Sequence, residues 1–205
     1  MPADRAGRIA GVVLAAGTST RMGQNKLLME LDGEPLVRRA VARAARAGLD
    51  PLIVVLGHEA DRVQSALDGL AYQPVVNADY ERGVNSSLRA GIQAASASGA
   101  RAAVVVLADM PFVTTAMLET LMQTYQQGSV PLVISDYDGV NAPPMLYDRS
   151  LFGELAQSEG QGCGKHVVKK HRHEAASASW PAEALTDLDE PQDFQRVREA
   201  VPTRE

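Results

Sequence analysis

The stretch "GVVLAAGTSTRMGQNKLL", from Gly11 to Leu28, starts as an apolar run and continues as a loop of small and hydroxyl residues that carries two cations. The apolar run predicts a buried strand over Ile9–Ala15. The small residues of the loop let the backbone approach a ligand, and its N–H groups can face phosphate oxygens. Arg21 can contact a phosphate through two N–H groups, and Lys26 supplies a point charge. The stretch therefore favours a polyphosphate-binding loop over the alternative, a structural turn with solvated cations.

Two well-known phosphate-binding loops do not match this stretch. In a P-loop the lysine directly follows a glycine and precedes Ser or Thr, whereas Lys26 follows Asn25 and precedes Leu27. The G-x-G-x-x-G spacing of dinucleotide-binding loops is also missing here.

Beyond this stretch, short β-rich runs alternate with helical patterns. Strands are predicted at Leu52–Leu56, Pro74–Asn77, Ala103–Leu107 and Val130–Ser135, and helices from Pro35 to Gly48, through Val63 and Leu67, over Ser87–Ser98, and after a cap at Thr114 or Thr115. Continuous apolar strands alternating with helices predict an α/β fold with a largely parallel sheet covered on both faces.

The pattern loosens after about residue 136. The later elements are a strand at Met145–Tyr147 that need not be parallel, helices at Arg149–Gln157 and Lys165–His171, a loop at Ala175–Ala184 and a last helix over 191–201. We expect a single domain over 1–205, with a regular half at about 9–135 and a less regular half at about 136–190.

Composition narrows the class of protein. The chain has 205 residues, 45% of them hydrophobic and 22% charged, as in a soluble globular protein. A net charge of −5 argues against a broad nucleic-acid or anionic-membrane surface. A single cysteine excludes an internal disulfide, and no apolar run approaches the ~18 residues of a membrane helix. With no signal-peptide pattern at the N-terminus, we expect a cytoplasmic protein without nucleic-acid or membrane partners.

Two acidic sites can bind a cation. Asp109 directly follows a buried strand, where ligands of open α/β sheets gather, and can bind Mg²⁺ beside phosphates. Asp187 and Asp189 alternate on an extended segment, so they point the same way and can reach one cation. The alternative for all three is a role at the start of the following helix.

Polar residues in "ERGVNSSLRAG" have two candidate roles. Asn85, Ser86 and Ser87 are predicted N-caps of the next helix, and the same groups can hydrogen-bond a base or ribose. The basic segment from Lys169 to His173 is predicted to be a solvated face, although it can attract an anionic acceptor.

Together these stretches resemble the MobA-like nucleotidyltransferases, in particular the molybdenum cofactor cytidylyltransferase branch. "LAAGTSTRMGQNKLL" resembles the signature L-A-A-G-x-S-x-R-M-G-x-x-K-L-L, and "VVVLADMP" resembles the metal-binding L-x-D-M-P. "ERGVNSSLRAGI" and "DLDEPQDF" resemble G-M-S-S-S-L-x-A-G-I and D-I-D-T-P-E-D. The resemblance implies a three-layer α/β/α, Rossmann-like fold of the nucleotide-diphospho-sugar transferase type with a mostly parallel sheet.

The resemblance also implies a reaction and its residues. An acceptor phosphate attacks the α-phosphorus of an NTP and pyrophosphate leaves, with Arg21, Lys26 and Asp109 as catalytic residues. Mg²⁺ would bind Asp109 with Asp187 or Asp189. The nucleotide-binding set would be Leu14, Ala15, Ala16, Gly17, Arg21, Lys26, Asn85, Ser86, Ser87 and Gly91. Guanylyl-transferring relatives read L-A-G-G where this chain has L-A-A-G, so Ala16 favours CTP.

The resemblance implies a nucleotide-binding half at about 9–135 and an acceptor-binding half at about 136–190. The acceptor-binding half departs from the family pattern. Pro143 stands in place of the histidine of G-H-P-x-L-F, and Gln161 in place of the acid of G-D-x-G-A-R. Asn141, Pro144 and Lys165 are the candidate acceptor-binding residues. We expect transfer of CMP from CTP to the phosphate of molybdopterin. The alternatives are guanylyl transfer, another phosphorylated acceptor, or a non-catalytic nucleotide-binding chaperone that hands cofactor to a molybdoenzyme client.

Overall fold

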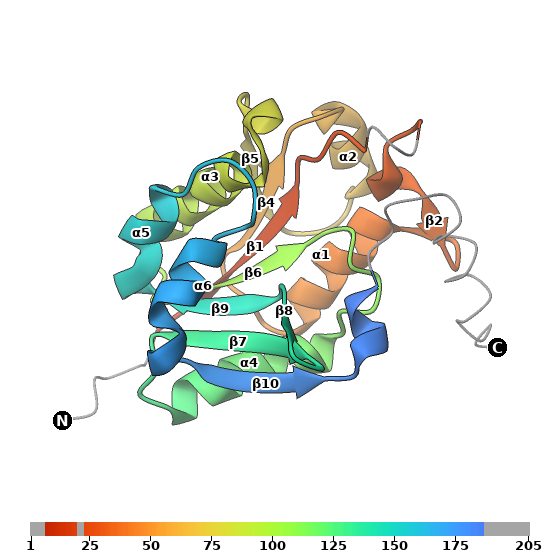
Figure 1. Ribbon diagram of the computed structural model, residues 1–205. Helices are drawn as coiled ribbons and strands as arrows, with labels where there is room; N and C mark the ends of the chain where they lie inside the picture. The colour runs from red at the N-terminus through yellow and green to blue at the C-terminus, as the bar shows by residue number, and fades with distance from the viewer. Residues whose placement is uncertain (1–6, 20–22, 187–205) are drawn as a thin grey trace.

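The computed structural model describes residues 7–19 and 23–186, in which eight strands form one sheet of order β10-β7-β9-β6-β1-β4-β5, with β8 paired to β7 (Figure 1). The strands are β1 (Ile9–Ala15), β4 (Leu52–Leu56), β5 (Gln73–Val76), β6 (Ala102–Leu107), β7 (Leu132–Tyr137), β8 (Val140–Asn141), β9 (Met145–Asp148) and β10 (Ala176–Trp180). Strands β6, β1, β4 and β5 are parallel neighbours, and β9 runs antiparallel between β6 and β7. The α/β class with a mostly parallel sheet is confirmed.

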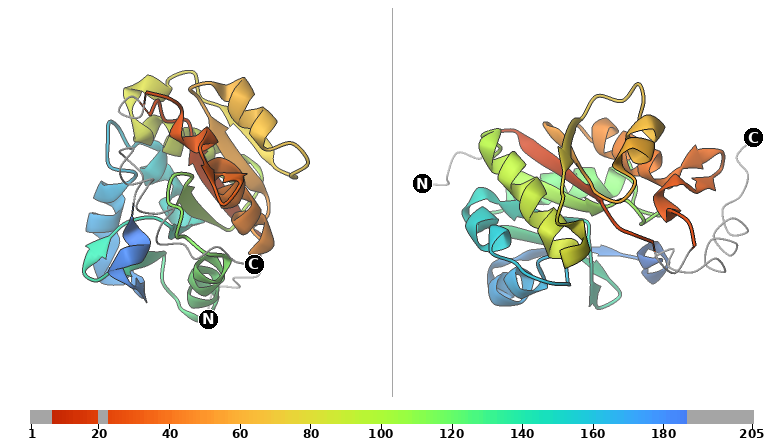
Figure 2. Two further views of the ribbon diagram at one scale, coloured as in Figure 1. Left: turned by 90° about the vertical axis from the view of Figure 1, so that its right-hand side faces the viewer. Right: turned by 90° about the horizontal axis from the view of Figure 1, so that it is seen from above.

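Helices cover both faces of this sheet. The helices are α1 (Leu36–Arg46), α2 (Ala60–Ala66), α3 (Val84–Ala97), α4 (Thr115–Gln127), α5 (Phe152–Ala156) and α6 (Lys165–His171). Along β1, Val13 and Ala15 pack with α1, α2 and α4, whereas Val12 and Leu14 pack with α3, α5 and α6. The left view of Figure 2 shows these two helix layers on opposite sides of the strands. Burial on both faces explains why the strands read as continuous apolar runs.

The segment Ala175–Ala184, predicted to be a loop, instead contains β10, which pairs in parallel with β7. That prediction was wrong because the strand is built from small residues without β-branched signals. Its alternation is visible only in the fold: Ala178 is buried, whereas Ser177 and Ser179 are exposed. The segment becomes a strand because it pairs with β7 at the edge of the sheet, and its composition does not indicate this pairing.

Other boundaries differ from the prediction. Helix α3 begins at Val84 with Gly83 as its N-cap, so Asn85, Ser86 and Ser87 lie inside the first turn and are not caps. A small hairpin of β2 (Glu30–Leu31) and β3 (Glu34–Pro35) was not foreseen. Single 3-10 turns complete the chain at η2 (Lys26–Leu28), η3 (Tyr80–Arg82), η4 (Arg149–Leu151), η5 (Arg172–Glu174) and η6 (Ala182–Leu185). The predicted helix at 191–201 lies outside the described residues.

No helix in the described part of the chain is long and apolar enough to cross a membrane.

Gly91 brings α3 into close contact with the sheet. A Cβ at this position would lie 2.3 Å from Val12 Cγ1 and 3.0 Å from Val55 Cγ2, both on buried strands. Gly91→Ala is therefore expected to lower the free energy of unfolding by about 1–3 kcal/mol through overpacking. Urea denaturation measures the change. Gly153→Ala is the matched control: it lies in α5 with nothing within 4 Å of its Cβ, and should stabilise by up to ~1 kcal/mol. Equal effects of the two variants would contradict this account.

A buried carboxylate closes the amino-terminal end of β6. Asp148 accepts hydrogen bonds from the Tyr125 hydroxyl and from Ser150 N, and its Oδ2 lies 3.2 Å from Arg101 Nη2. Burial opposes ionisation of Asp148, but these bonds and the Arg101 charge outweigh it and lower its pKa. Because the pKa is lowered on folding, its stabilisation is present above the unfolded pKa, near ~3.9, and is lost as the pH falls through the folded pKa.

Tyr125→Phe is therefore expected to cost about 1.5–3 kcal/mol at pH 7, the range for a hydrogen bond to a charged group. The difference from the unmodified chain should shrink as the pH falls through the folded pKa of Asp148. Urea denaturation over a series of decreasing pH values tests this, with Tyr72→Phe on a partly exposed ring as the control. If Tyr125→Phe lowered the free energy of unfolding by the same amount at every pH, the Tyr125 hydroxyl would not act by stabilising the ionised carboxylate of Asp148.

Candidate active site

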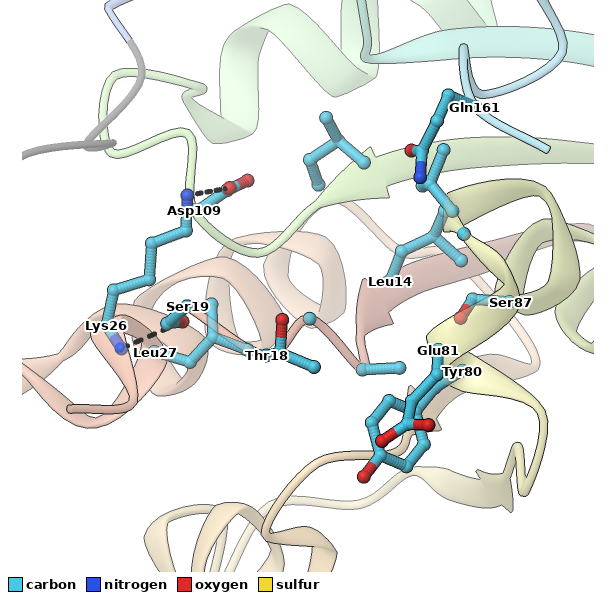
Figure 3. Close-up of a pocket in the computed structure, with 15 residues that line it drawn as sticks. Leu14, Thr18, Ser19, Lys26, Leu27, Tyr80, Glu81, Ser87, Asp109 and Gln161 are labelled. Atoms are coloured by element: carbon cyan, nitrogen blue, oxygen red, sulfur yellow. Dashed lines mark hydrogen bonds and ion pairs between the residues drawn. The ribbon is translucent and has the colours of Figure 1, made fainter. Parts of the chain in front are cut away.

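The register of the central strands brings the opening loop and Asp109 to one edge of the sheet. Leu14 pairs with Leu107, and Ala108 N donates to Leu14 O at 3.1 Å, so the segments that follow β1 and β6 leave the sheet side by side. A pocket of about 700 Å³ opens at this edge (Figure 3). Its lining residues are Leu14, Ala16, Gly17, Thr18, Ser19, Lys26, Leu27, Tyr80, Glu81, Gly83, Val84, Ser87, Leu107, Asp109 and Gln161. We call it the first pocket.

Lys26 and Asp109 form an ion pair at one end of the first pocket. Lys26 Nζ lies 2.6 Å from Asp109 Oδ2, and the two side chains are 13% and 24% exposed. The two groups are thus counterions of each other, and both line the first pocket. A phosphate can take the ammonium group, and a cation can take the carboxylate.

The backbone around Lys26 is fixed locally. Asn25 caps η2 by accepting from Leu27 N at 3.1 Å, and Lys26 N donates to Ser19 Oγ at 3.1 Å. The second bond ties the far end of the loop to its beginning. The lysine is therefore held at the pocket by a short turn that its own neighbours stabilise.

The predicted nucleotide-binding residues divide into two groups. Leu14, Ala16, Gly17, Lys26 and Ser87 line the first pocket. Ala15, Asn85, Ser86 and Gly91 do not appear in its lining. Ala15 packs on the opposite face of the sheet, and Gly91 packs against Val12, as the alternation of β1 and the contact of α3 require.

The remaining two polar members make contacts within the fold. Ser86 Oγ donates to Asp79 O and Gly83 O, at 2.9 and 2.8 Å. The Asn85 side chain is buried and bonds to the loop 159–164.

Of the predicted metal ligands, Asp109 alone lies in the described part of the chain. Arg21, Asp187 and Asp189 fall outside it. Among residues 7–19 and 23–186, no three His, Cys, Asp or Glu side chains come close enough to hold a metal ion. One accessible carboxylate beside a phosphate-sized space nevertheless suits Mg²⁺, which binds through one or two carboxylates together with substrate phosphates.

Tyr80, Glu81 and Gln161 are among the pocket residues that the sequence reasoning missed. Tyr80 and Glu81 belong to η3, and Gln161 comes from the loop before α6. In Figure 3 they lie across the pocket from Lys26 and Asp109. Gln161 stood out only as a departure from a family motif, and η3 has no periodic pattern to reveal it.

A second pocket of about 750 Å³ adjoins the first, because Val84 and Leu107 line both. Its lining includes the apolar side chains of Met110, Ala142, Pro143, Met145 and Val168. Lys165, Lys169 and Arg172 also line it. Lys165 and Lys169, four residues apart, lie on one side of α6, and Arg172 follows as the first residue of η5.

The basic segment is largely exposed, as predicted. Lys169 and Arg172 also line the second pocket. The Arg172 guanidinium donates to Asn141 Oδ1, and Asn141 Nδ2 donates to Asp136 Oδ2 at 3.0 Å. In the other part of the segment, Lys170 Nζ lies 3.0 Å from Glu154 Oε2 in a surface ion pair, and His171 Nε2 lies 3.1 Å from Glu154 Oε1.

Two of the three predicted acceptor-binding residues, Asn141 and Lys165, line the second pocket. Pro144 does not; its carbonyl accepts from the buried Ser135 hydroxyl, and the preceding Pro143 lines the pocket instead.

Known proteins are similar to this chain in sequence and in architecture. The profile of the MobA-like NTP transferase domain matches residues 11–175. The Purine catabolism protein PucB of Bacillus subtilis (strain 168) is 27% identical over 204 residues, which cover 94% of this chain and 97% of PucB. A protein of Opitutus terrae named "Probable molybdenum cofactor guanylyltransferase" is 31% identical over 142 residues, covering 69% of this chain and 67% of that protein.

Solved structures agree with these matches. The crystal structure of Rv0371c from Mycobacterium tuberculosis H37Rv superposes with a TM-score of 0.81 at 31% identity, covering 95% of this chain and 100% of that one. Another structure of Rv0371c, with a TM-score of 0.73 and 28% identity over the same coverage, is a complex with manganese. The family match and the relatives define a nucleotidyltransferase. The chain belongs to the MobA-like NTP transferase family.

Proposed function

We propose that this protein transfers CMP from CTP to the phosphate of molybdopterin, with release of pyrophosphate and a requirement for Mg²⁺. The observation that carries the proposal is the Lys26–Asp109 pair, 2.6 Å apart, in a pocket that adjoins a second pocket lined by three cations. Family membership and the name of the Opitutus relative support nucleotidyl transfer to a molybdenum cofactor.

The two pockets suit the two substrates of such a transfer. The nucleotide occupies the first pocket with its phosphates toward Lys26, and the acceptor occupies the second. An oxygen of the acceptor phosphate bonds to the α-phosphorus, the bond from that phosphorus to the bridging oxygen breaks, and pyrophosphate leaves. Lys26 donates to the phosphate oxygens, and Arg21 is assigned to the β- and γ-phosphates. Catalysis here depends on alignment and neutralised charge more than on a general base.

Asp109 is the proposed anchor for Mg²⁺, with Asp187 or Asp189 as the second carboxylate. When bound, the ion would neutralise phosphate charge and hold nucleotide and acceptor in register. Before substrate arrives, the Asp109 carboxylate is ion-paired with the Lys26 ammonium group. The manganese complex of Rv0371c supports a divalent cation in this family.

Ala16 favours CTP over GTP in this proposal. It is 5% exposed, and a Cβ on Gly57 would lie 2.7 Å from its methyl group, so the end of β4 leaves the Ala16 methyl only limited space. A second candidate, guanylyl transfer, is favoured by the Glu81 carboxylate in the same pocket, since guanine offers two adjacent N–H donors on N1 and N2. The name of the Opitutus relative also supports it.

A pyrophosphate-release screen tests the proposal. CTP, GTP, ATP and UTP are each combined with Mg²⁺ and with molybdopterin or a few sugar phosphates. We expect release with CTP and molybdopterin. Release with GTP alone among the nucleotides would overturn the choice of base, and release only with a sugar phosphate would overturn the acceptor. Stabilisation of the fold by CTP without any release would instead support the non-catalytic chaperone.

A further inference from the structure

The loop 159–164 forms part of both pockets. Its Gln161 lines the first pocket, and its Gly162 and Cys163 line the second. It also leads directly into α6, which begins at Lys165 and carries two of the three cations that line the second pocket, Lys165 and Lys169. A displacement of this loop would therefore alter the nucleotide site and the acceptor site together.

The side chain of Asn85 holds this loop in place. Asn85 Nδ2 donates to Glu159 O at 2.6 Å and to Gln161 O at 3.2 Å, and Gly164 N donates to Asn85 Oδ1 at 2.9 Å. The backbone adds a fourth bond, from Asn85 N to Gly160 O at 3.2 Å. Asn85 is 2% exposed, and both its amide hydrogens and its oxygen are used. A fully bonded, buried amide fixes its partners in one arrangement.

The backbone of the loop requires such support. Gly160, Gly162, Cys163 and Gly164 have positive φ angles of 66°, 108°, 44° and 75°. Cys163 is not a glycine, so this conformation is strained for it and is maintained by the surrounding structure. Asn85 bonds to the loop at both ends of this stretch.

Gln161 lines the first pocket on the side opposite Lys26 and Asp109 (Figure 3). A Cβ on Gly83 would lie 2.8 Å from Gln161 Nε2 and 2.7 Å from Gly160 O, so the loop lies directly on the start of α3. Tyr80 and Glu81 line the same side of the pocket, across from Lys26 and Asp109 (Figure 3). A side-chain amide both donates and accepts, as the Watson–Crick edge of a nucleobase requires.

We propose that Gln161 binds the nucleobase and that Asn85 is the positioning residue that sets Gln161, acting through the loop 159–164 without touching the nucleotide. This inference rests on the proposed function, because it takes the first pocket as the nucleotide site. It assigns the contact to a residue at which the family motif is broken, and it gives Asn85 a different task from the direct contact expected for it.

Cys163 provides an independent measure of the loop. It is the single cysteine of the chain, lies in the loop and is partly buried. Burial raises the pKa of its thiol to about 12. Its alkylation by iodoacetamide should be slow while the loop is held and faster once the loop is released.

The test compares three variants for CTP dissociation constant with Mg²⁺ and for the rate of Cys163 alkylation. Asn85→Asp keeps the shape but turns two donors into an acceptor facing carbonyls, so we expect CTP affinity to fall at least about tenfold and alkylation to quicken at least about fivefold. Gln161→Ala should weaken CTP binding about three- to tenfold with unchanged alkylation. Glu159→Ala, which retains the carbonyl that accepts from Asn85, is the control and should change neither.

The outcomes separate the parts of the inference. Unchanged CTP affinity in folded Asn85→Asp or in Gln161→Ala would overturn it. Weaker CTP binding with unchanged alkylation in Asn85→Asp would also overturn it, because Asn85 would then act on the nucleotide directly. If Asn85→Asp does not fold, Asn85→Ser carries the same comparison without a charge. If the unmodified chain binds no NTP, the proposed function fails, whereas alkylation still tests whether Asn85 holds the loop.

Discussion

Replacing Lys26 with alanine is expected to lower kcat for pyrophosphate release by about 10²–10³-fold, the range for losing one preorganised contact to developing charge. The Lys26 side chain is 13% exposed and its ammonium group lies 2.6 Å from Asp109, so the group is already ordered and needs little rearrangement to reach a phosphate. Its loss removes a donor to the phosphates. It also leaves the Asp109 carboxylate without this counterion, and the negative charge of the carboxylate then repels an incoming triphosphate.

Lys26→Met separates charge from packing, because it keeps most of the side-chain length without the ammonium. We expect it to be as slow as Lys26→Ala. Lys170→Met is the control: Lys170 pairs with Glu154 at 3.0 Å on the surface and is 64% exposed, so its removal should leave turnover within about twofold. Steady-state assays with varied CTP give kcat and KM for each variant. Near-native turnover of Lys26→Met would remove Lys26 from the catalytic set.

The sequence predicts the elements whose local pattern and tertiary environment agree. β1 and β4 have the predicted bounds because both are continuous apolar runs buried on two faces. The parallel register that follows from them places Lys26 and Asp109 in one pocket, as the residues after adjacent strand ends suggest. These features depend on short-range patterns, which sequence reasoning can recognise.

The missed features depend on contacts between distant segments. Asn85 is polar and close to a helix start, so a cap or ligand contact is the natural prediction. Its partners are residues 159–164, more than 70 positions later, and no local signal indicates them. The same holds for Arg172, whose place beside Asn141 follows from the packing of α6 on the sheet. β10 was missed because its alanines and serines are typical of loops, and only pairing with β7 makes them a strand.

Asp109→Asn is expected to raise the half-saturating Mg²⁺ concentration about 10–100-fold and to lower kcat about 100-fold at the cation level that saturates the unmodified chain. The amide is nearly the same size as the carboxylate but lacks its charge, and hard cations such as Mg²⁺ bind carboxylate oxygens best. Asp50→Asn is the control, since Asp50 pairs with Arg8 at 3.5 Å and is 67% exposed. An unchanged Mg²⁺ titration would remove Asp109 from the metal site.

The ion pair gives this variant a second effect of opposite sign. Without Mg²⁺, Asp109 competes with phosphate for the Lys26 ammonium, which lies 2.6 Å from its carboxylate. Asp109→Asn ends that competition, so CTP should bind more tightly than to the unmodified chain in EDTA, although turnover with Mg²⁺ falls. Lys26→Met combined with Asp109→Asn should be little slower than the worse single variant, because residues that act as a unit are not additive. Weaker metal-free CTP binding in Asp109→Asn would show that the carboxylate orients Lys26 for the nucleotide rather than competing for it.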